Sequence, residues 1–355
     1  MNSPKSFLSL VAAVAMTFGL STSTVQAQCL ADVNHDHLVD GVDLTQILST
    51  WGTNGGSVGS DINGDGSVDG GDLAIVLGAW GVCPDPTWGT VLEWTPDPAV
   101  VTDANLRAAI TATNLPWRVR DNGTNIEMLL VPGGTFTMGC SASNLYACAS
   151  DEYPTHQLAL SAFYVGRYEV TQAQWQAKMG SNPSYFQPPK FTWDTNRPVE
   201  QVSWNMIQSF NTTTGLRLPT EAEWEYAFRA GTTAAFHSFP GYTSGTDDDT
   251  LLGNIAWYAS NSGGQPQAVG GKYANALGLH DVAGNVWEWC EDWYGGTYYA
   301  SSPTTNPTGP LTGSAHVLRG GDWASISGRC RVSWRGCDMP DYIAYGNGFR
   351  VVRNP

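Results

Sequence analysis

Two short apolar stripes, 29 residues apart, are the clearest hydrophobic pattern in the N-terminal part of the chain. Their residues are Leu44, Ile47, Leu48 and Trp51 in the first copy, and Leu73, Val76, Leu77 and Trp80 in the second. The i, i+3, i+4, i+7 spacing places each set on one face of a helix. The pattern therefore predicts two short helices that bury these faces against each other.

The rest of the chain alternates short apolar runs with glycine turns and helix caps. Residues 128–139 predict a strand, a tight glycine turn and a second strand. Residues 164–179 predict a strand that ends at a cap and leads into a helix. Thr220 and Glu223 have the spacing of a capping box, which indicates a helix start. These elements predict a loop-rich α+β domain over residues 117–355.

The first residues have the pattern of a secretory signal. Lys5 precedes an apolar run over 7–20, and residues 25–27 end in a small side chain. We expect residues 1–27 to be removed before Gln28, because the apolar run is shorter than the ~20 residues that a membrane span needs. The expected location is secreted or periplasmic, with no membrane span.

Charge narrows the partner classes. The chain has 17 basic and 32 acidic residues, a net charge of −15, which argues against nucleic acid as a partner. Eight aspartates and no Lys, Arg or Glu lie between Cys29 and Cys83. Such a segment repels itself unless cations neutralise it.

These aspartates recur at the same 29-residue offset as the apolar stripes. Oxygen-bearing side chains occupy positions 1, 3, 5, 9 and 12 of two loops: Asp32, Asn34, Asp36, Asp40 and Asp43, then Asp61, Asn63, Asp65, Asp69 and Asp72. This is the ligand spacing of an EF-type loop, which binds Ca²⁺ through six to eight oxygens. Position 6 takes a left-handed turn and is Gly66 in one loop but His37 in the other, so we expect the first site to be weaker.

The repeat resembles the type I dockerin module from Asp32 to Trp80. The resemblance implies a small all-α domain with paired EF loops, bound Ca²⁺, and attachment to a cohesin-like or other exported protein.

Seven cysteines in an exported chain favour disulfides. Cys29 and Cys83 bracket the dockerin-like domain (29–83), and a bond between them would stabilise it. Cys140 and Cys148 most simply pair with each other. Residues 84–116 are interpreted as a linker, with a short helix over 104–113 opened by Asp103.

Six motifs in the large domain carry a second resemblance. In order, they are residues 128–139, 164–171, 217–227, 285–289, 319–323 and 347–350. Together they resemble the formylglycine-generating enzyme, or sulfatase-modifying factor, family. The resemblance implies a C-type-lectin-like fold with little regular secondary structure, and an oxidase that converts a cysteine in a sulfatase peptide to formylglycine with copper and oxygen.

Family members bind Cu(I) through two cysteines five residues apart, since soft thiolates suit this ion. Here Cys330 falls on the second position, but Ser325 falls on the first and Asp322 replaces a serine. A serine hydroxyl is a poor Cu(I) ligand, so two thiolates are not available from these positions. A disulfide from Cys330 to Cys290 or Cys337 is the simpler expectation.

The resemblance also implies calcium in the large domain. Asn285, the Val286 carbonyl and Glu288 match one site, and Asn254 with the Ile255 carbonyl matches part of another. Two functions remain open: a copper-dependent oxidase acting on exported sulfatases, and a non-catalytic lectin-like module that binds a peptide or glycan within an extracellular assembly.

Overall fold

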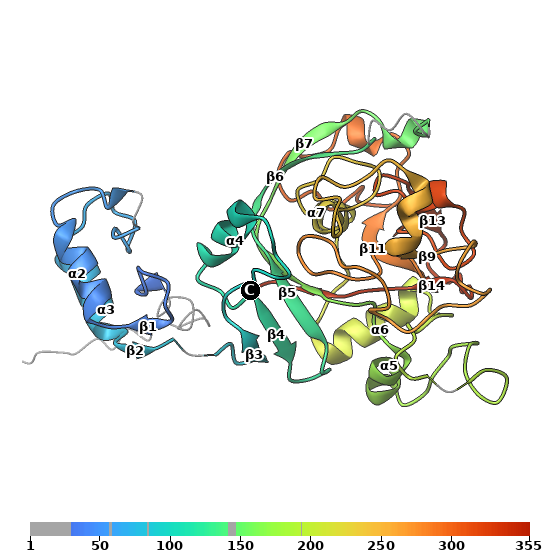
Figure 1. The fold of residues 1–355 in the computed structure, drawn as a ribbon, viewed down its shortest axis with the longest axis horizontal. Helices are drawn as coiled ribbons and strands as arrows, with labels where there is room; N and C mark the ends of the chain where they lie inside the picture. Colours follow the sequence, from blue (N-terminus) through green and yellow to red (C-terminus); the bar gives the residue numbers. More distant parts are fainter. Residues whose placement is uncertain (1–29, 57–58, 84, 141–146, 193) are drawn as a thin grey trace, which may run out of the picture. The chain divides into compact units, whose positions relative to one another are not determined.

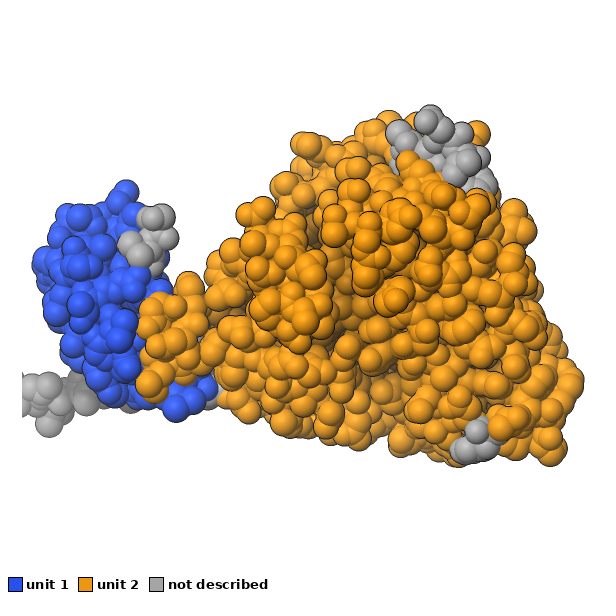
Figure 2. Space-filling view, in the orientation of Figure 1, with its two compact units in different colours: residues 1–33, 39–84 blue, residues 34–38, 85–355 orange. Residues whose placement is uncertain are grey.

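The computed structural model describes residues 30–56, 59–83, 85–140, 147–192 and 194–355. The chain divides into two compact units, coloured separately in Figure 2. Unit 1 comprises residues up to 33 together with 39–84, and unit 2 comprises 34–38 and 85–355. The predicted signal peptide and Cys29 lie outside the described residues.

Unit 1 contains the two predicted helices, α2 (Gly41–Ser49) and α3 (Gly70–Gly78), which pack together. Each begins at an aspartate with a capping box: Asp40 with Asp43, and Asp69 with Asp72. Strand β1 (Leu38–Val39) pairs with β2 (Gly81–Val82). The repeat seen in the sequence is thus repeated in three dimensions.

The predicted burial of the two apolar faces is only partly correct. Ile47 and Val76 are fully buried. Leu44 and Leu73 are half-buried, whereas Leu48 and Leu77 are each 54% exposed, and Trp51 and Trp80 are 47% and 51% exposed. Each helix has only nine residues, too few to bury all the apolar side chains of its partner. Each copy therefore leaves one leucine and one tryptophan on the surface.

Unit 2 is built around a five-stranded sheet in which all neighbouring strands are antiparallel (Figure 1). Its order is β15 (Val352–Arg353), β8 (Phe163–Gly166), β5 (Glu127–Val131), β4 (Arg118–Asp121) and β3 (Gly89–Glu93). Strand β3 lies inside the predicted linker, so that linker is shorter than expected. The sequence of β3 is only half apolar, as suits an edge strand. The hydrophobic pattern from which a strand is predicted is therefore weak here.

A four-stranded sheet lies later in the chain. Its order is β13 (Gly336–Asp338), β12 (His316–Arg319), β11 (Trp287–Trp293) and β14 (Asn347–Gly348). Two further pairs are β6 (Gly134–Met138) with β7 (His156–Leu160), and β9 (Ala256–Trp257) with β10 (Ala283–Gly284). The stretch 347–353 therefore supplies one strand to each of the larger sheets.

Three helices of unit 2 begin where the caps predict: α4 (Ala104–Thr111), α5 (Gln172–Met179) and α7 (Glu221–Arg229). A further helix, α6 (Trp204–Thr214), was not predicted and begins at the Ser203 cap. Asp103 caps α4, Thr171 caps α5, and Thr220 forms the predicted capping box with Glu223. The short 3-10 turns are η2 (Ser150–Glu152), η3 (Asp249–Asn254), η4 (Tyr298–Ala300) and η5 (Ser327–Cys330).

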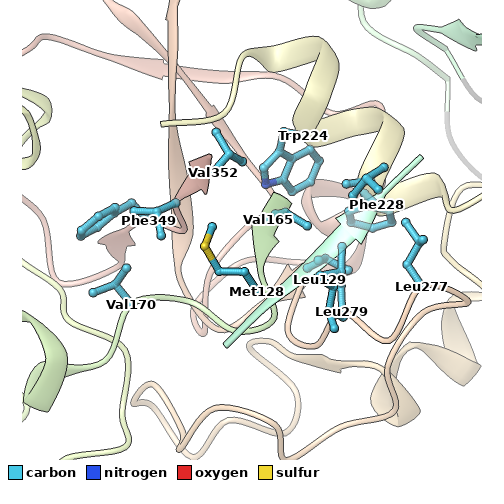
Figure 3. Close-up of a cluster of buried hydrophobic side chains, with 14 of the residues drawn as sticks. Met128, Leu129, Val165, Val170, Trp224, Phe228, Leu277, Leu279, Phe349 and Val352 are labelled. Atoms are coloured by element: carbon cyan, nitrogen blue, oxygen red, sulfur yellow. The ribbon is translucent and has the colours of Figure 1, made fainter. Parts of the chain in front are cut away.

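The core of unit 2 joins the five-stranded sheet to α7. Figure 3 shows Met128, Leu129 and Val165 from the sheet beside Trp224 and Phe228 of the helix. All five are at most 3% exposed. The architecture is a mixed α+β fold, as predicted. None of the helices in the described part of the chain is both long enough and apolar enough to cross a bilayer.

Candidate functional site

Several sequence motifs of unit 2 meet in buried ion pairs. Arg319 pairs with Glu225 and Glu221 of α7, which lie more than ninety positions away in the chain. Arg350 holds Glu288 through two bonds of 2.6 Å, and both side chains are at most 2% exposed. A buried carboxylate without such a partner is costly. These motif residues therefore position the loops and are not themselves open to a ligand.

The segment after β12 turns sharply at Gly320 and Gly321, which have φ values of +93° and +77°. A Cβ at Gly321 would lie 2.9 Å from the Cys330 sulfur, closer than packed atoms tolerate. The two glycines thus fold the segment 322–330 back on itself. This is the place where the sequence predicts a copper site.

Ser325 does not lie beside Cys330 as a free hydroxyl. Its Oγ donates to Asp322 Oδ1 at 2.5 Å and accepts from the Asp322 amide at 3.1 Å. Burial raises the pKa of Asp322, and the bond from Ser325 opposes that rise. A Cβ on Gly346 would collide with the Asp322 carboxylate, so this glycine makes room for it. Asp322 and Ser325, the two residues that differ from the family motif, are therefore hydrogen-bonded to each other.

Cys330 is fully buried at the end of η5. Its sulfur lies 3.8 Å from the Ile326 carbonyl oxygen, which it faces as a weak donor. Burial, with a further contribution from Asp322, raises the pKa of this thiol far above its usual range. Burial therefore favours the thiol of Cys330 over its thiolate.

The expected disulfide of Cys330 is wrong for both partners. Cys290, Cys330 and Cys337 all carry free thiols, with Cys290 buried on β11 and Cys337 exposed on β13. The Cys140–Cys148 bond is confirmed, with its Cα atoms 5.8 Å apart. The predicted Cys29–Cys83 bond involves a residue outside the described part of the chain.

These residues do not fit a copper ion. Cu(I) sites need soft thiolates, whereas Ser325 offers a hard hydroxyl already bound to Asp322. The raised pKa of Cys330 opposes loss of the proton that copper must displace. No chemical step through copper follows from this arrangement.

The predicted calcium residues of unit 2 lie in a buried acidic cluster. Asn285 donates from Nδ2 to Glu169 at 2.6 Å, and the Val286 amide donates to the same carboxylate at 3.1 Å. Desolvation, then the charges of Asp281 and Glu288, raises the pKa of Glu169 well above its usual range. Sequence reasoning missed Glu169 and Asp281, because neither lies in the motif that carries Asn285 and Glu288.

The cluster holds three buried carboxylates against the one guanidinium of Arg350. Asp281 Oδ1 has no hydrogen-bond partner in the described residues. A cation would satisfy this orphan oxygen. No three His, Cys, Asp or Glu side chains in the described ranges converge closely enough to hold a metal ion by themselves. Both Glu288 oxygens already accept from Arg350, and one also accepts from Trp224, so a calcium site at Glu288 remains a prediction.

The second predicted position is less favourable for calcium. Asn254 donates from its side chain to the Leu251 carbonyl at 2.9 Å, and Ile255 is fully buried. Lys272 places its ammonium 2.5 Å from the Gly253 carbonyl and 3.8 Å from the Trp257 ring centre. A fixed positive charge one residue from Asn254 repels a second cation.

In the second loop of the N-terminal repeat, the predicted ligands accept from loop amides. Asp61 accepts from the Gly66 amide at 2.8 Å, and Asn63 accepts from Asp65 at 3.0 Å. Asp72 accepts from the Ile62 amide at 2.7 Å. Burial opposes a fall in the pKa of Asp72, but its backbone donors outweigh that effect and lower it.

The first loop repeats this geometry. Asn34 accepts from the Asp36 amide at 3.0 Å, Asp43 accepts from Val33 at 2.7 Å, and Asp40 caps α2. His37 has a φ of +71°, and Gly66 at the same position of the second loop has +92°. A histidine therefore occupies a left-handed position that favours glycine, as the sequence suggests. The described side chains of these loops do not form a cluster of three or more acidic or histidine groups that could hold a metal ion by itself, so Ca²⁺ binding by this spacing of oxygens remains a prediction.

Comparison with known proteins gives the same assignment for the large domain. Residues 114–355 match the family described as sulfatase-modifying factor enzyme 1-like domain. The chain is 31% identical over 285 residues to the formylglycine-generating enzyme of Streptomyces coelicolor, covering 63% of this chain and 88% of that protein.

Two solved structures resemble the fold. Variable protein 1 of Treponema denticola is 33% identical with a TM-score of 0.57, and the match covers 65% of this chain and 95% of that one. PvdO from Pseudomonas aeruginosa is 25% identical with a TM-score of 0.56, and the match covers 67% and 98%. With motifs, fold and family match in agreement over unit 2, the chain belongs to the sulfatase-modifying factor enzyme 1-like family.

Proposed function

We propose that this chain is an exported, non-catalytic binding member of its family, attached to a partner protein through a calcium-loaded, dockerin-like N-terminal unit. The observation that carries the first part is the Ser325–Asp322 hydrogen bond of 2.5 Å beside a buried Cys330 thiol. It replaces the pair of thiolates that copper chemistry requires.

An aromatic cluster beside this pair offers a binding surface for a peptide. Trp323 follows Asp322 directly, and its ring lies 5.4 Å from Phe186. Tyr345 is 49% exposed and lies 4.5 Å from the Tyr185 ring. Trp323 also donates to the Tyr345 carbonyl at 3.0 Å, which fixes the loop. An exposed ring such as that of Tyr345, held rigidly in this way, provides contact area at a low entropic cost.

The alternative is the oxidase activity for which the Streptomyces coelicolor relative is named. A turnover assay separates the two. The full chain is reduced, loaded with Cu(I), and given oxygen and a Cys-x-Pro-x-Arg peptide, with mass spectrometry detecting the aldehyde. The double variant Asp322→Ser/Ser325→Cys restores both motif positions. Ser327→Cys is the matched control, because it adds a nearby thiol at a position bound to Asp249.

We expect no aldehyde from the natural chain or from Ser327→Cys. Product from the double variant alone would show that the substrate groove persists without its metal ligands. Aldehyde from the natural chain would overturn the proposal and assign catalysis to Cys330 with another ligand.

The N-terminal unit supports the second part of the proposal. The two copies of its repeat expose equivalent apolar pairs, Leu48 with Trp51 and Leu77 with Trp80. Calorimetry with a type I cohesin domain tests the partner directly. We expect binding in Ca²⁺, none in EDTA, and a loss of affinity in Trp51→Ala/Trp80→Ala. Val82→Ala is the control, since Val82 is 72% exposed but lies on β2. Calcium-independent binding would contradict this role.

A further inference from the structure

The loop of residues 182–191, here called the Phe186 loop, forms one side of the aromatic surface of Trp323 and Tyr345. The centre of the Phe186 ring lies 5.4 Å from that of Trp323 and 6.5 Å from that of Tyr345, edge-on to both. It also lies 4.8 Å from the Phe191 ring of the same loop. Phe186 is only 4% exposed, so this side chain packs the loop against the surface.

The chain before α6 holds the Phe186 loop through polar bonds. Glu200 Oε1 accepts from the Phe186 amide at 2.9 Å, and the Glu200 amide donates to Ser184 Oγ at 3.2 Å. Gln201, the next residue, donates from its amide to the Ala344 carbonyl at 3.1 Å. This short segment therefore joins the Phe186 loop to the loop that follows β13.

Glu200 lacks the counter-charge that other buried glutamates of unit 2 have. Glu152, Glu221 and Glu288 each pair with an arginine. Glu200 is fully buried, its Oε2 has no hydrogen-bond partner in the described residues, and no basic side chain among those residues forms an ion pair with it. Ionising a buried carboxyl group without a counter-charge is costly, so this environment favours the neutral acid.

The pKa of Glu200 agrees with this arrangement. Burial raises it from 4.5 to about 8, against the effects of the Phe186 amide and the Ser184 hydroxyl. Charges on the surrounding segments add nothing to the rise. The charged groups there are Glu169, Lys190, Asp194, Arg197, Asp322 and Asp341, and the tyrosines are Tyr185 and Tyr345. The carboxyl group thus keeps its proton over a pH range in which an exposed glutamate is ionised.

We propose that Glu200 is a proton-dependent switch for the aromatic surface: the neutral carboxyl group holds the Phe186 loop closed, and loss of its proton to water lets the loop open. The carboxylate regains its hydration only when the Phe186 amide releases it. Opening moves the Phe186 ring away from Trp323 and Tyr345. The consequence for a bound peptide rests on the proposed function of this surface, whereas the opening itself does not.

The loop should open more readily as the pH rises from about 5 to about 8. In this interval the closed form holds a proton that the open form has lost, so opening releases a proton. The opening constant therefore rises about tenfold with each pH unit. It levels off above about pH 8, because the carboxyl group is then ionised in both forms.

Hydrogen exchange of the full chain without ligand measures this opening. Mass spectrometry follows peptides that contain residues 182–191 and, as a core reference, 127–131, from pH 5 to 9, with each rate divided by the intrinsic rate at that pH. Glu200→Gln keeps an oxygen acceptor for the loop amide but cannot ionise. Asp194→Asn is the matched control, because the Asp194 carboxylate accepts from the Asn196 amide and not from the Phe186 loop.

We expect the opening constant of the Phe186 loop to rise about tenfold from pH 6 to pH 7 in the natural chain and in Asp194→Asn. In Glu200→Gln it should change by less than about twofold. The core reference should open far more rarely at every pH. Thermal melting at pH 5, where Glu200 is protonated, checks that each variant is folded.

The proposal is overturned if the natural loop opens equally at pH 5 and pH 8, if Glu200→Gln keeps the rise, or if the loop opens only together with the core. Because no ligand is present, a surface that binds no peptide would leave these results unchanged. Failure of the switch and failure of the proposed function are therefore distinguishable.

Discussion

Replacing Arg350 with methionine should destabilise unit 2 severely. Arg350 makes two 2.6 Å bonds to Glu288 and also donates to the Gly166 and His280 carbonyl oxygens at 3.0 Å. Methionine keeps much of the side-chain length but leaves the Glu288 charge buried. Removing one partner of a buried pair costs about 3–5 kcal/mol.

Two further buried carboxylates, Glu169 and Asp281, share the Arg350 charge, so we expect the upper part of that range. For a domain of this size, 1 kcal/mol shifts the melting temperature by roughly 2–4 °C, which gives a fall of about 10–15 °C. Calorimetry and urea unfolding measure both quantities, and each is run in EDTA and in Ca²⁺.

Arg120→Met is the control. Arg120 is 46% exposed and lies 3.3 Å from Glu127, a surface pair worth about 1 kcal/mol at most. The double variant Arg350→Met/Glu288→Gln should recover part of the loss, since it no longer buries an unpaired charge. If Arg350→Met costs no more than Arg120→Met, the buried pair does not hold the loops together.

Three other predictions concern thiols, protons and calcium. At pH 8, iodoacetamide should label the exposed Cys337 before the buried Cys330, and equal labelling by mass spectrometry would contradict the burial argument. Burial raises the pKa of Glu200 from 4.5 to about 8, so the folded protein retains a proton that the unfolded chain loses in this interval. The free energy of unfolding should therefore fall from pH 5 to 8, and Glu200→Gln should flatten that fall in urea titrations; parallel curves would refute it. His37→Gly should raise the Ca²⁺ affinity of the first loop by about tenfold in calorimetry, because glycine removes roughly 1–2 kcal/mol of left-handed strain, and an unchanged affinity would count against a metal site there.

The helix starts could be predicted from the sequence because their causes are local. Thr171 and Thr220 bind amides three residues away, so a window of four residues contains the whole interaction. The Arg319–Glu225 pair spans 94 positions, and no local pattern identifies which glutamate an arginine will meet. Glu169 joins the acidic cluster for the same reason, through contacts with Asn285 at a separation of 116.

Burial was harder to predict where it depends on several elements at once. The helical spacing placed Ile47 and Trp51 on one face, and the structure buries only Ile47. The cysteines illustrate a related limit. The short loop between Cys140 and Cys148 makes their bond predictable, whereas the fold decides whether Cys330 can meet another thiol.

Strands β14 and β15 have a consequence for folding during synthesis. Both lie within residues 347–353, and they pair with β11 and β8 respectively. Until this segment emerges from the ribosome, β8 and β11 are the open edges of their sheets. All four residues of β8 are buried in the finished fold, so its early edge is apolar and prone to pairing with other chains. The nascent domain thus needs protection from aggregation until its last strands arrive.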